Sequence, residues 1–73
     1  MSEIQMQSVT SSNIGSIGYD EEEKILRVQF AKNGHVYDYR GVPKRTYDDL
    51  MSAESIGAFF AANIRNDFPF TKI

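Results

Sequence analysis

The chain has 73 residues, with 8 Lys and Arg against 10 Asp and Glu, a net charge of −2 and no cysteine. This length fits one domain, expected to span residues 1–73, because a domain needs about 50 residues or more. The composition excludes disulfides, a thiolate nucleophile and a Cys-ligated metal, and its acidic balance argues against a protein that grips a phosphate backbone by charge alone.

The first part of the chain has the weakest pattern. Residues 1–13 are polar, and both an edge strand and a frayed segment, above all at 1–7, are compatible with them. The pattern of a short strand follows at residues 14–19. Its two glycines, Gly15 and Gly18, indicate a bend or the close approach of another backbone.

A hairpin is predicted over residues 24–40. Apolar and polar side chains alternate from residue 24 to residue 30, which is the period of a half-buried strand. Asn33-Gly34 is a strong turn signal, because both residues tolerate positive φ. The second strand is expected at residues 35–40.

Two registers are open for this hairpin. A two-residue turn would set Arg27 opposite Arg40, whereas a four-residue loop would set Arg27 opposite Asp38. We favour the longer loop, because directly opposed like charges destabilise a sheet and opposite charges stabilise it. In either register Tyr37 and Tyr39 share the apolar face.

Two helices are predicted after the sheet. Pro43 is expected near the first position of a helix that ends by Ser52 or Ala53, since the missing N–H of proline costs nothing there. Ser55 is the expected N-cap of a second helix, with apolar residues at helical spacing and an end after Arg65.

The C-terminal segment at residues 68–70, Phe-Pro-Phe, is too apolar to remain in water. We expect an extended tail that packs back on the sheet or the helices. Together the elements predict an α+β fold, with a small antiparallel sheet of three or four strands followed by two helices packed on one face.

Enzymatic chemistry finds little support in the residues. His35 is the one histidine, and no partner lies at the spacing of a metal site or an acid–base pair. The acidic residues 20–23 lack the pattern of a calcium loop. A domain of this size has little with which to build and shield an active site. We expect no enzyme activity, no metal and no cofactor.

The most suggestive pair of residues is Tyr37 and Tyr39. Two aromatic rings on one sheet face could stack bases, as they do in RNA-binding sheets. The same face must also cover the apolar stripes of two helices, which favours a role for both rings in the core.

Four basic residues are candidate nucleic-acid contacts, namely Arg40, Lys44, Arg45 and Arg65. Lys44 and Arg45 begin a helix close to the end of the strand that carries Arg40, so these charges could converge into a small anion site. Ordinary solubilising charge is the competing explanation. The acidic turn at residues 20–23 is expected to lie away from this basic corner.

Several short motifs follow one another between residues 8 and 70: Ser11-Ser12, Ile17-Gly18-Tyr19-Asp20, Tyr37-Asp38-Tyr39, Gly41-Val42-Pro43, Tyr47, Gly57-x-Phe59-Phe60, Arg65 and Phe68-Pro69-Phe70. In this order they resemble the KTSC domain family, which is named for its occurrence at the C-terminus of some lysyl-tRNA synthetases. The resemblance implies a small sheet followed by two helices, and the synthetase context implies nucleic-acid binding, with RNA first. On this match Tyr37 and Tyr39 form the central Tyr-x-Tyr motif, and Arg65 is the Arg late in the last helix.

Two positions depart from the family pattern. Many members have Ser-Lys-Gly and Phe-Asn where this chain has Ser55-Ile56-Gly57 and Phe60-Ala61. The chain therefore lacks a Lys and an Asn that could serve a ligand.

We expect a small non-enzymatic binding module for RNA or a nucleotide-bearing ligand, of bacterial or phage origin. The alternative is a module for protein–protein interaction or homo-oligomerisation through an exposed strand edge. No apolar run reaches the roughly 20 residues of a membrane span, and residues 1–10 do not have the pattern of a signal peptide. A cytoplasmic location with no membrane partner is therefore expected.

Overall fold

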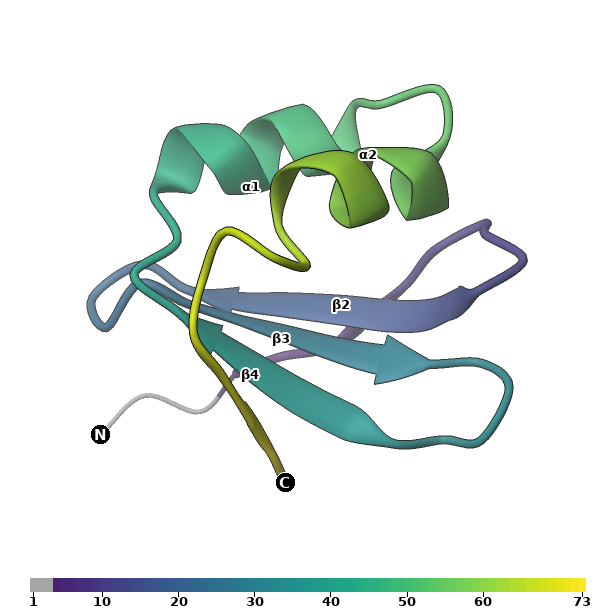
Figure 1. The fold of residues 1–73 in the computed structure, drawn as a ribbon, viewed down its shortest axis with the longest axis horizontal. Helices are drawn as coiled ribbons and strands as arrows, with labels where there is room; N and C mark the ends of the chain where they lie inside the picture. The colour runs from purple at the N-terminus through teal and green to yellow at the C-terminus, as the bar shows by residue number, and fades with distance from the viewer. Residues whose placement is uncertain (1–3) are drawn as a thin grey trace.

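All strands belong to one antiparallel sheet whose order follows the chain. The computed structural model describes residues 4–73. The strands are β1 (Gln7–Ser8), β2 (Ile14–Asp20), β3 (Ile25–Phe30), β4 (Val36–Arg40) and β5 (Phe70–Lys72), in the order β1-β2-β3-β4-β5. The helices α1 (Lys44–Met51) and α2 (Ile56–Asn63) both lie over one face of this sheet (Figure 1). The predicted α+β class, with both helices on one face, is confirmed.

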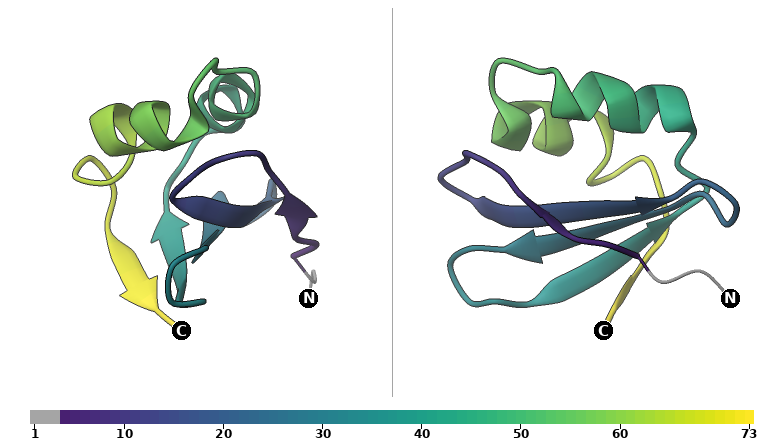
Figure 2. Two further views of the ribbon diagram at one scale, coloured as in Figure 1. Left: turned by 90° about the vertical axis from the view of Figure 1, so that its right-hand side faces the viewer. Right: turned by 180° about the vertical axis from the view of Figure 1, so that it is seen from behind.

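The number of strands was predicted too low, since the sheet has five strands rather than three or four. The two short strands β1 and β5 lie at opposite edges of the sheet (Figure 2). They contain two and three residues, too few to show an alternating pattern in the sequence. The C-terminal tail does pack back on the sheet, because the amide of Arg40 donates to the carbonyl of Pro69 at 2.9 Å and that of Ile73 to the carbonyl of Val36 at 2.8 Å.

The N-terminal segment forms an edge strand that begins at Gln7. Residues 4–6 lie against β2, and the predicted fraying of residues 1–3 falls outside the described residues. Gly18 shows why this approach is possible: a Cβ built on it would stand 2.7 Å from the carbonyl oxygen of Gln5. Gly15 lies at a β-bulge, where the register between β2 and β3 shifts. The bend and the close backbone approach are therefore both present in β2.

The β3–β4 hairpin has the longer loop. Arg27 lies opposite Asp38, and its Nε and Nη2 donate to the two carboxylate oxygens at 2.7 and 3.0 Å. This bidentate ion pair stabilises the register in which Arg27 faces Asp38. The predicted four-residue loop and its register are therefore confirmed. Gly34 takes a φ of +74° and donates its amide to the carbonyl of Phe30, whereas Asn33 has negative φ and accepts the amide of His35 with its side chain.

Both helices begin where the sequence placed them. Pro43 is the N-cap of α1, and the side chain of Ser55 accepts the amide of Ala58 at 3.3 Å as the N-cap of α2. Helix α2 ends at Asn63, so Arg65 lies beyond the helix and not in its last turn. None of the described helices is long and apolar enough to cross a membrane.

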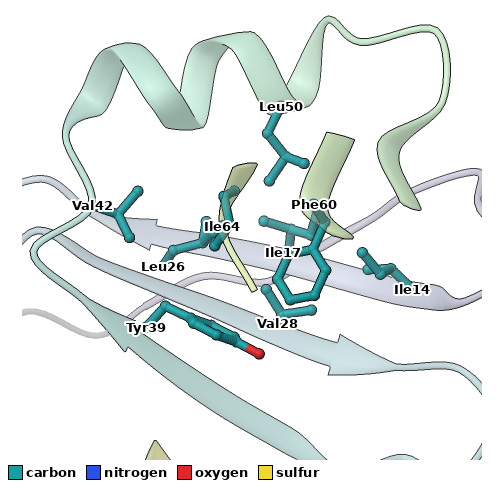
Figure 3. Packing of buried hydrophobic residues seen from close by; sticks show 9 residues of the cluster. All are labelled: Ile14, Ile17, Leu26, Val28, Tyr39, Val42, Leu50, Phe60 and Ile64. Atoms are coloured by element: carbon teal, nitrogen blue, oxygen red, sulfur yellow. The ribbon is translucent and has the colours of Figure 1, made fainter. Parts of the chain in front are cut away.

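The core lies between the two helices and the sheet. Figure 3 shows the side chains of Leu50, Phe60 and Ile64 directed from the helical layer toward the strands. The buried hydrophobic residues are Ile14, Ile17, Leu26, Val28, Tyr39, Val42, Leu50, Phe60 and Ile64. Aromatic residues continue this core outward between α2 and β4, where the candidate site lies.

Candidate functional site

A groove of about 500 Å³ runs between α2 and the edge formed by β4 and β5. Its wall is built mainly from five aromatic side chains, Phe30, Tyr37, Tyr39, Phe60 and Phe70. They come from β3, β4, α2 and β5, so the groove exists only when the tail has joined the sheet. Its volume lies within the range of small-molecule and cofactor sites.

The five rings contact one another in a closed circuit. Phe30 contacts Tyr37, Tyr37 contacts Phe70, Phe70 contacts Tyr39, Tyr39 contacts Phe60, and Phe60 contacts Phe30, with centroids 5.2 to 5.7 Å apart. Four of these contacts are edge-to-face, an arrangement that aromatic quadrupoles favour. Tyr39 and Phe60 are buried at 4% and 3% exposure, whereas Phe70 is 53% exposed. The circuit therefore has a buried side that belongs to the core and a more open side, where Phe30 and Tyr37 are partly buried and Phe70 is exposed.

The polar residues of the groove are cationic or neutral. Lys32 and Arg65 line it together with Asn13, Asn33 and Asn66, and within residues 4–73 no Asp or Glu lines it. Among the described residues, neither Lys32 nor Arg65 takes part in an ion pair. Although the chain as a whole is acidic, this site combines an apolar wall with two cations that form no ion pair with a described carboxylate.

The two cations enter the groove from different segments. Lys32 lies in the β3–β4 loop, whose Ala31 amide donates to the carbonyl of Asn13 at 2.9 Å. Gly57, in the first turn of α2, is also beside Asn13. Arg65 follows the other end of α2, and the β3–β4 loop that carries Lys32 lies below the start of α2 (Figure 1). The segments that carry the two cations are therefore at opposite ends of the helix.

Only one of the four predicted basic contacts lines this groove. Arg65 does, whereas Arg40, Lys44 and Arg45 do not. The ammonium of Lys44 is held by Asp48 at 3.1 Å, and this hydrogen bond raises the pKa of Lys44 above its ordinary value. The residue that the sequence reasoning missed is Lys32, which shows no motif and is recognised only by its place in the fold.

The acidic turn was predicted in the wrong place. It lies at the same end of the sheet as the start of α1 (Figure 1), and the amide of Val42 donates to the carbonyl of Lys24 at 3.0 Å. The charge of Glu21 also helps to raise the pKa of Lys44. In an antiparallel meander the β2–β3 turn and the end of β4 must lie at the same end of the sheet, and Ile25 at the start of β3 does pair with Arg40 at the end of β4. The basic corner at Arg40 to Arg45 is thus partly neutralised by its acidic neighbours.

The one histidine of the chain lies outside the groove. His35 is exposed in the β3–β4 loop. No group of three His, Asp or Glu residues that could hold a metal ion is found within residues 4–73.

The hydroxyl of Tyr39 is expected to lose its proton at a higher pH than that of an exposed tyrosine. Burial raises the pKa of its hydroxyl above the ordinary value of 10.0, the neighbouring Tyr37 raises it further, and Arg65 acts in the opposite direction. An unfolded tyrosine loses its proton near pH 10, so between that pH and the folded pKa the native state holds more protons. The contribution of Tyr39 to stability is therefore complete below pH 10 and is lost as the pH rises through the folded pKa.

This can be measured by following tyrosinate absorbance in the native protein, which has 4 Tyr and no Trp. The Tyr39→Phe variant should lose a component that titrates above pH 10. Tyr19, whose pKa is also raised by burial, serves as the comparison in a Tyr19→Phe variant. If Tyr39→Phe instead removes a component centred at pH 10, the expectation is wrong.

Comparison with known proteins places this architecture in a family. The profile of the KTSC domain matches residues 10–68. A crystal structure of a KTSC domain protein from Yersinia pestis superposes with a TM-score of 0.92 and 45% identity, covering 97% of this chain and 99% of that one. A protein of Tsukamurella paurometabola is 43% identical over 63 residues, which are 86% of this chain and 92% of that protein. An uncharacterised protein of Stutzerimonas stutzeri is 40% identical over 53 residues, or 73% of each chain. The chain therefore belongs to the KTSC domain family.

Proposed function

We propose that this KTSC domain is a non-enzymatic binding module whose groove takes RNA or another nucleotide-bearing ligand. The observation that carries the proposal is the composition of the groove, to which the described part of the chain contributes five aromatic rings, two cations and no carboxylate. Bases stack on aromatic side chains with about 1–3 kcal/mol each. Arg and Lys supply the charge that phosphate requires. The synthetase context that the sequence resemblance implies is the reason to test RNA first, and a cysteine-free domain is compatible with a cytoplasmic location.

Within this proposal Arg65 and Lys32 are the principal phosphate contacts. Arg65 was predicted as a nucleic-acid contact from the sequence, and it lines the groove. Lys32 is added because it lines the same groove. Arg40, Lys44 and Arg45 have a peripheral role, since none of them lines the groove. Lys44 also forms an ion pair with Asp48 and lies near Glu21. Tyr37 contributes a partly exposed ring on which a base can stack, whereas the buried ring of Tyr39 belongs to the wall of the groove.

The direct test is a titration of labelled single-stranded RNA and of tRNA at low and moderate salt. We expect a Kd below roughly 100 μM at low salt that weakens as salt rises. Arg65→Gln should weaken binding about tenfold, because a hydrogen bond to a charged group is lost. Lys44→Gln is the matched control, and its Kd should change less than about twofold. The RNA form of the proposal fails if neither RNA shows salt-dependent binding in this range.

A second candidate function is self-association or protein binding through β5. Two of the large hydrophobic residues that remain exposed, Phe70 at 53% and Ile73 at 63%, lie in or next to this edge strand. An open edge can pair with a second chain, although three residues make a short template. Size-exclusion chromatography with light scattering decides the self-association form, since a strict monomer at high concentration removes it.

A further inference from the structure

We propose that the groove accepts one nucleotide, with its base against the ring circuit and its two phosphate positions at Lys32 and Arg65, rather than a run of nucleotides. This inference rests on the proposed function and names the ligand class of the same site. A nucleoside 3′,5′-bisphosphate carries the base and both of the phosphates that this site would recognise. The same groups are present in one nucleotide of an RNA strand.

The arrangement of the rings limits the number of bases. Proteins that hold single strands place separate aromatic residues along a charged path, so that successive bases each find a ring. Here the five rings contact one another in a closed circuit, and the two most buried, Tyr39 and Phe60, belong to the core. Among the described residues, one continuous, partly open surface remains, made by the adjacent rings of Phe30, Tyr37 and Phe70. It offers a single platform.

The boundaries of the groove limit its length. The β3–β4 loop with Lys32 and Asn33 stands at one end, and Arg65 with Asn66 stands at the other. Its volume of about 500 Å³ is that of a site for one small ligand. The asparagine amides at both ends can donate to and accept from the edges of a base or a sugar.

The charges limit the number of phosphates. Of the residues that the structure describes, two cations and no acid line the groove, and one cation lies toward each end of α2. A 5′-phosphate and a 3′-phosphate flank the sugar of a single nucleotide, so two separated cations match one nucleotide with both of its phosphates. Further phosphates would meet no groove cation, and the Lys44 ammonium is paired with Asp48.

Isothermal titration with three probes tests this inference: a nucleoside 5′-monophosphate, the corresponding 3′,5′-bisphosphate and a hexanucleotide RNA. The bisphosphate should bind one to one, with a Kd within about fivefold of the hexanucleotide, since a second stacked base would improve affinity by about fivefold or more. Lys32→Gln and Arg65→Gln should each weaken the bisphosphate about tenfold. With the monophosphate only one of the two variants should have an effect, because one phosphate is missing. Both side chains are exposed, so neither change should unfold the domain, and circular dichroism checks this.

Each outcome has a distinct meaning. Tight binding of the hexanucleotide with no binding of the bisphosphate overturns the one-nucleotide site and leaves RNA binding in place. Failure of all three probes overturns the proposed function and this inference with it. Binding of the nucleotides without the hexanucleotide supports the inference and identifies a free nucleotide as the ligand, whereas equal binding of the bisphosphate and the hexanucleotide supports it with a nucleotide of a strand as the ligand.

Discussion

Replacement of Phe60 by alanine is expected to lower the free energy of unfolding by about 3–5 kcal/mol. The Phe60 ring is 3% exposed and meets Phe30 and Tyr39 at centroid distances of 5.7 and 5.2 Å. Its loss leaves a cavity between α2 and the sheet that the surrounding residues fill only in part. For a small domain, whose whole stability is about 5–10 kcal/mol, this is a large share. Urea denaturation followed by circular dichroism measures it.

Phe70→Ala is the matched control for this experiment. Phe70 belongs to the same ring circuit, but it is 53% exposed and leaves no closed cavity when truncated. Its cost should be about 1 kcal/mol. Equal losses for the two variants would show that the circuit is stabilised by its ring contacts rather than by burial under α2.

Replacement of Gly18 by valine is expected to destabilise the fold by about 1–3 kcal/mol and to release the N-terminal segment from β2. A Cβ at this position would lie 2.7 Å from the carbonyl oxygen of Gln5 and 2.8 Å from the sulfur of Met6. The thioether can rotate away, but the backbone oxygen cannot, so residues 4–6 must move. Hydrogen exchange should show faster exchange of the Val9 amide, which donates to Gly15 at 3.2 Å.

Gly15→Ala provides the comparison on the same strand. The nearest atoms to a Cβ built there are 3.6 Å away, which is ordinary contact. Its unfolding free energy should stay within about 0.5 kcal/mol of the parent. If Gly15→Ala costs as much as Gly18→Val, then the contact between residue 18 and Gln5 is not the cause of the loss, because replacing glycine where φ is negative does not by itself destabilise the fold.

The sequence was most informative where the determinants are local. The hairpin register could be chosen because Arg27 and Asp38 attract each other in only one of two alignments, and the structure has that alignment. Ser55 was recognised as an N-cap from its own side chain and the apolar spacing after it. Neighbouring residues decide these features, so the pattern alone is sufficient.

The groove could not be predicted because it depends on segments far apart in the chain. Lys32 is a loop residue outside any sequence motif. It lines the same groove as Arg65 only because α2 lies across the sheet. β5 has three residues, and its pairing is decided by the free edge of β4. The acidic turn, in contrast, could have been placed from the sequence. The antiparallel order of β2, β3 and β4 alone requires this turn to lie at the end of the sheet where α1 begins, beside Lys44.

The strand order has a consequence for the sequence of folding events. Short loops at residues 9–13, 21–24 and 31–35 join the first four strands, whereas residues 41–69 separate β4 from β5. Closing the longer connection costs about 1.5 kcal/mol more in chain entropy. The pairing of β5 is therefore the last to become favourable as the chain folds. Because Phe70 completes the groove, partly folded forms of the domain have no binding site, and a ligand that binds there stabilises only the finished fold.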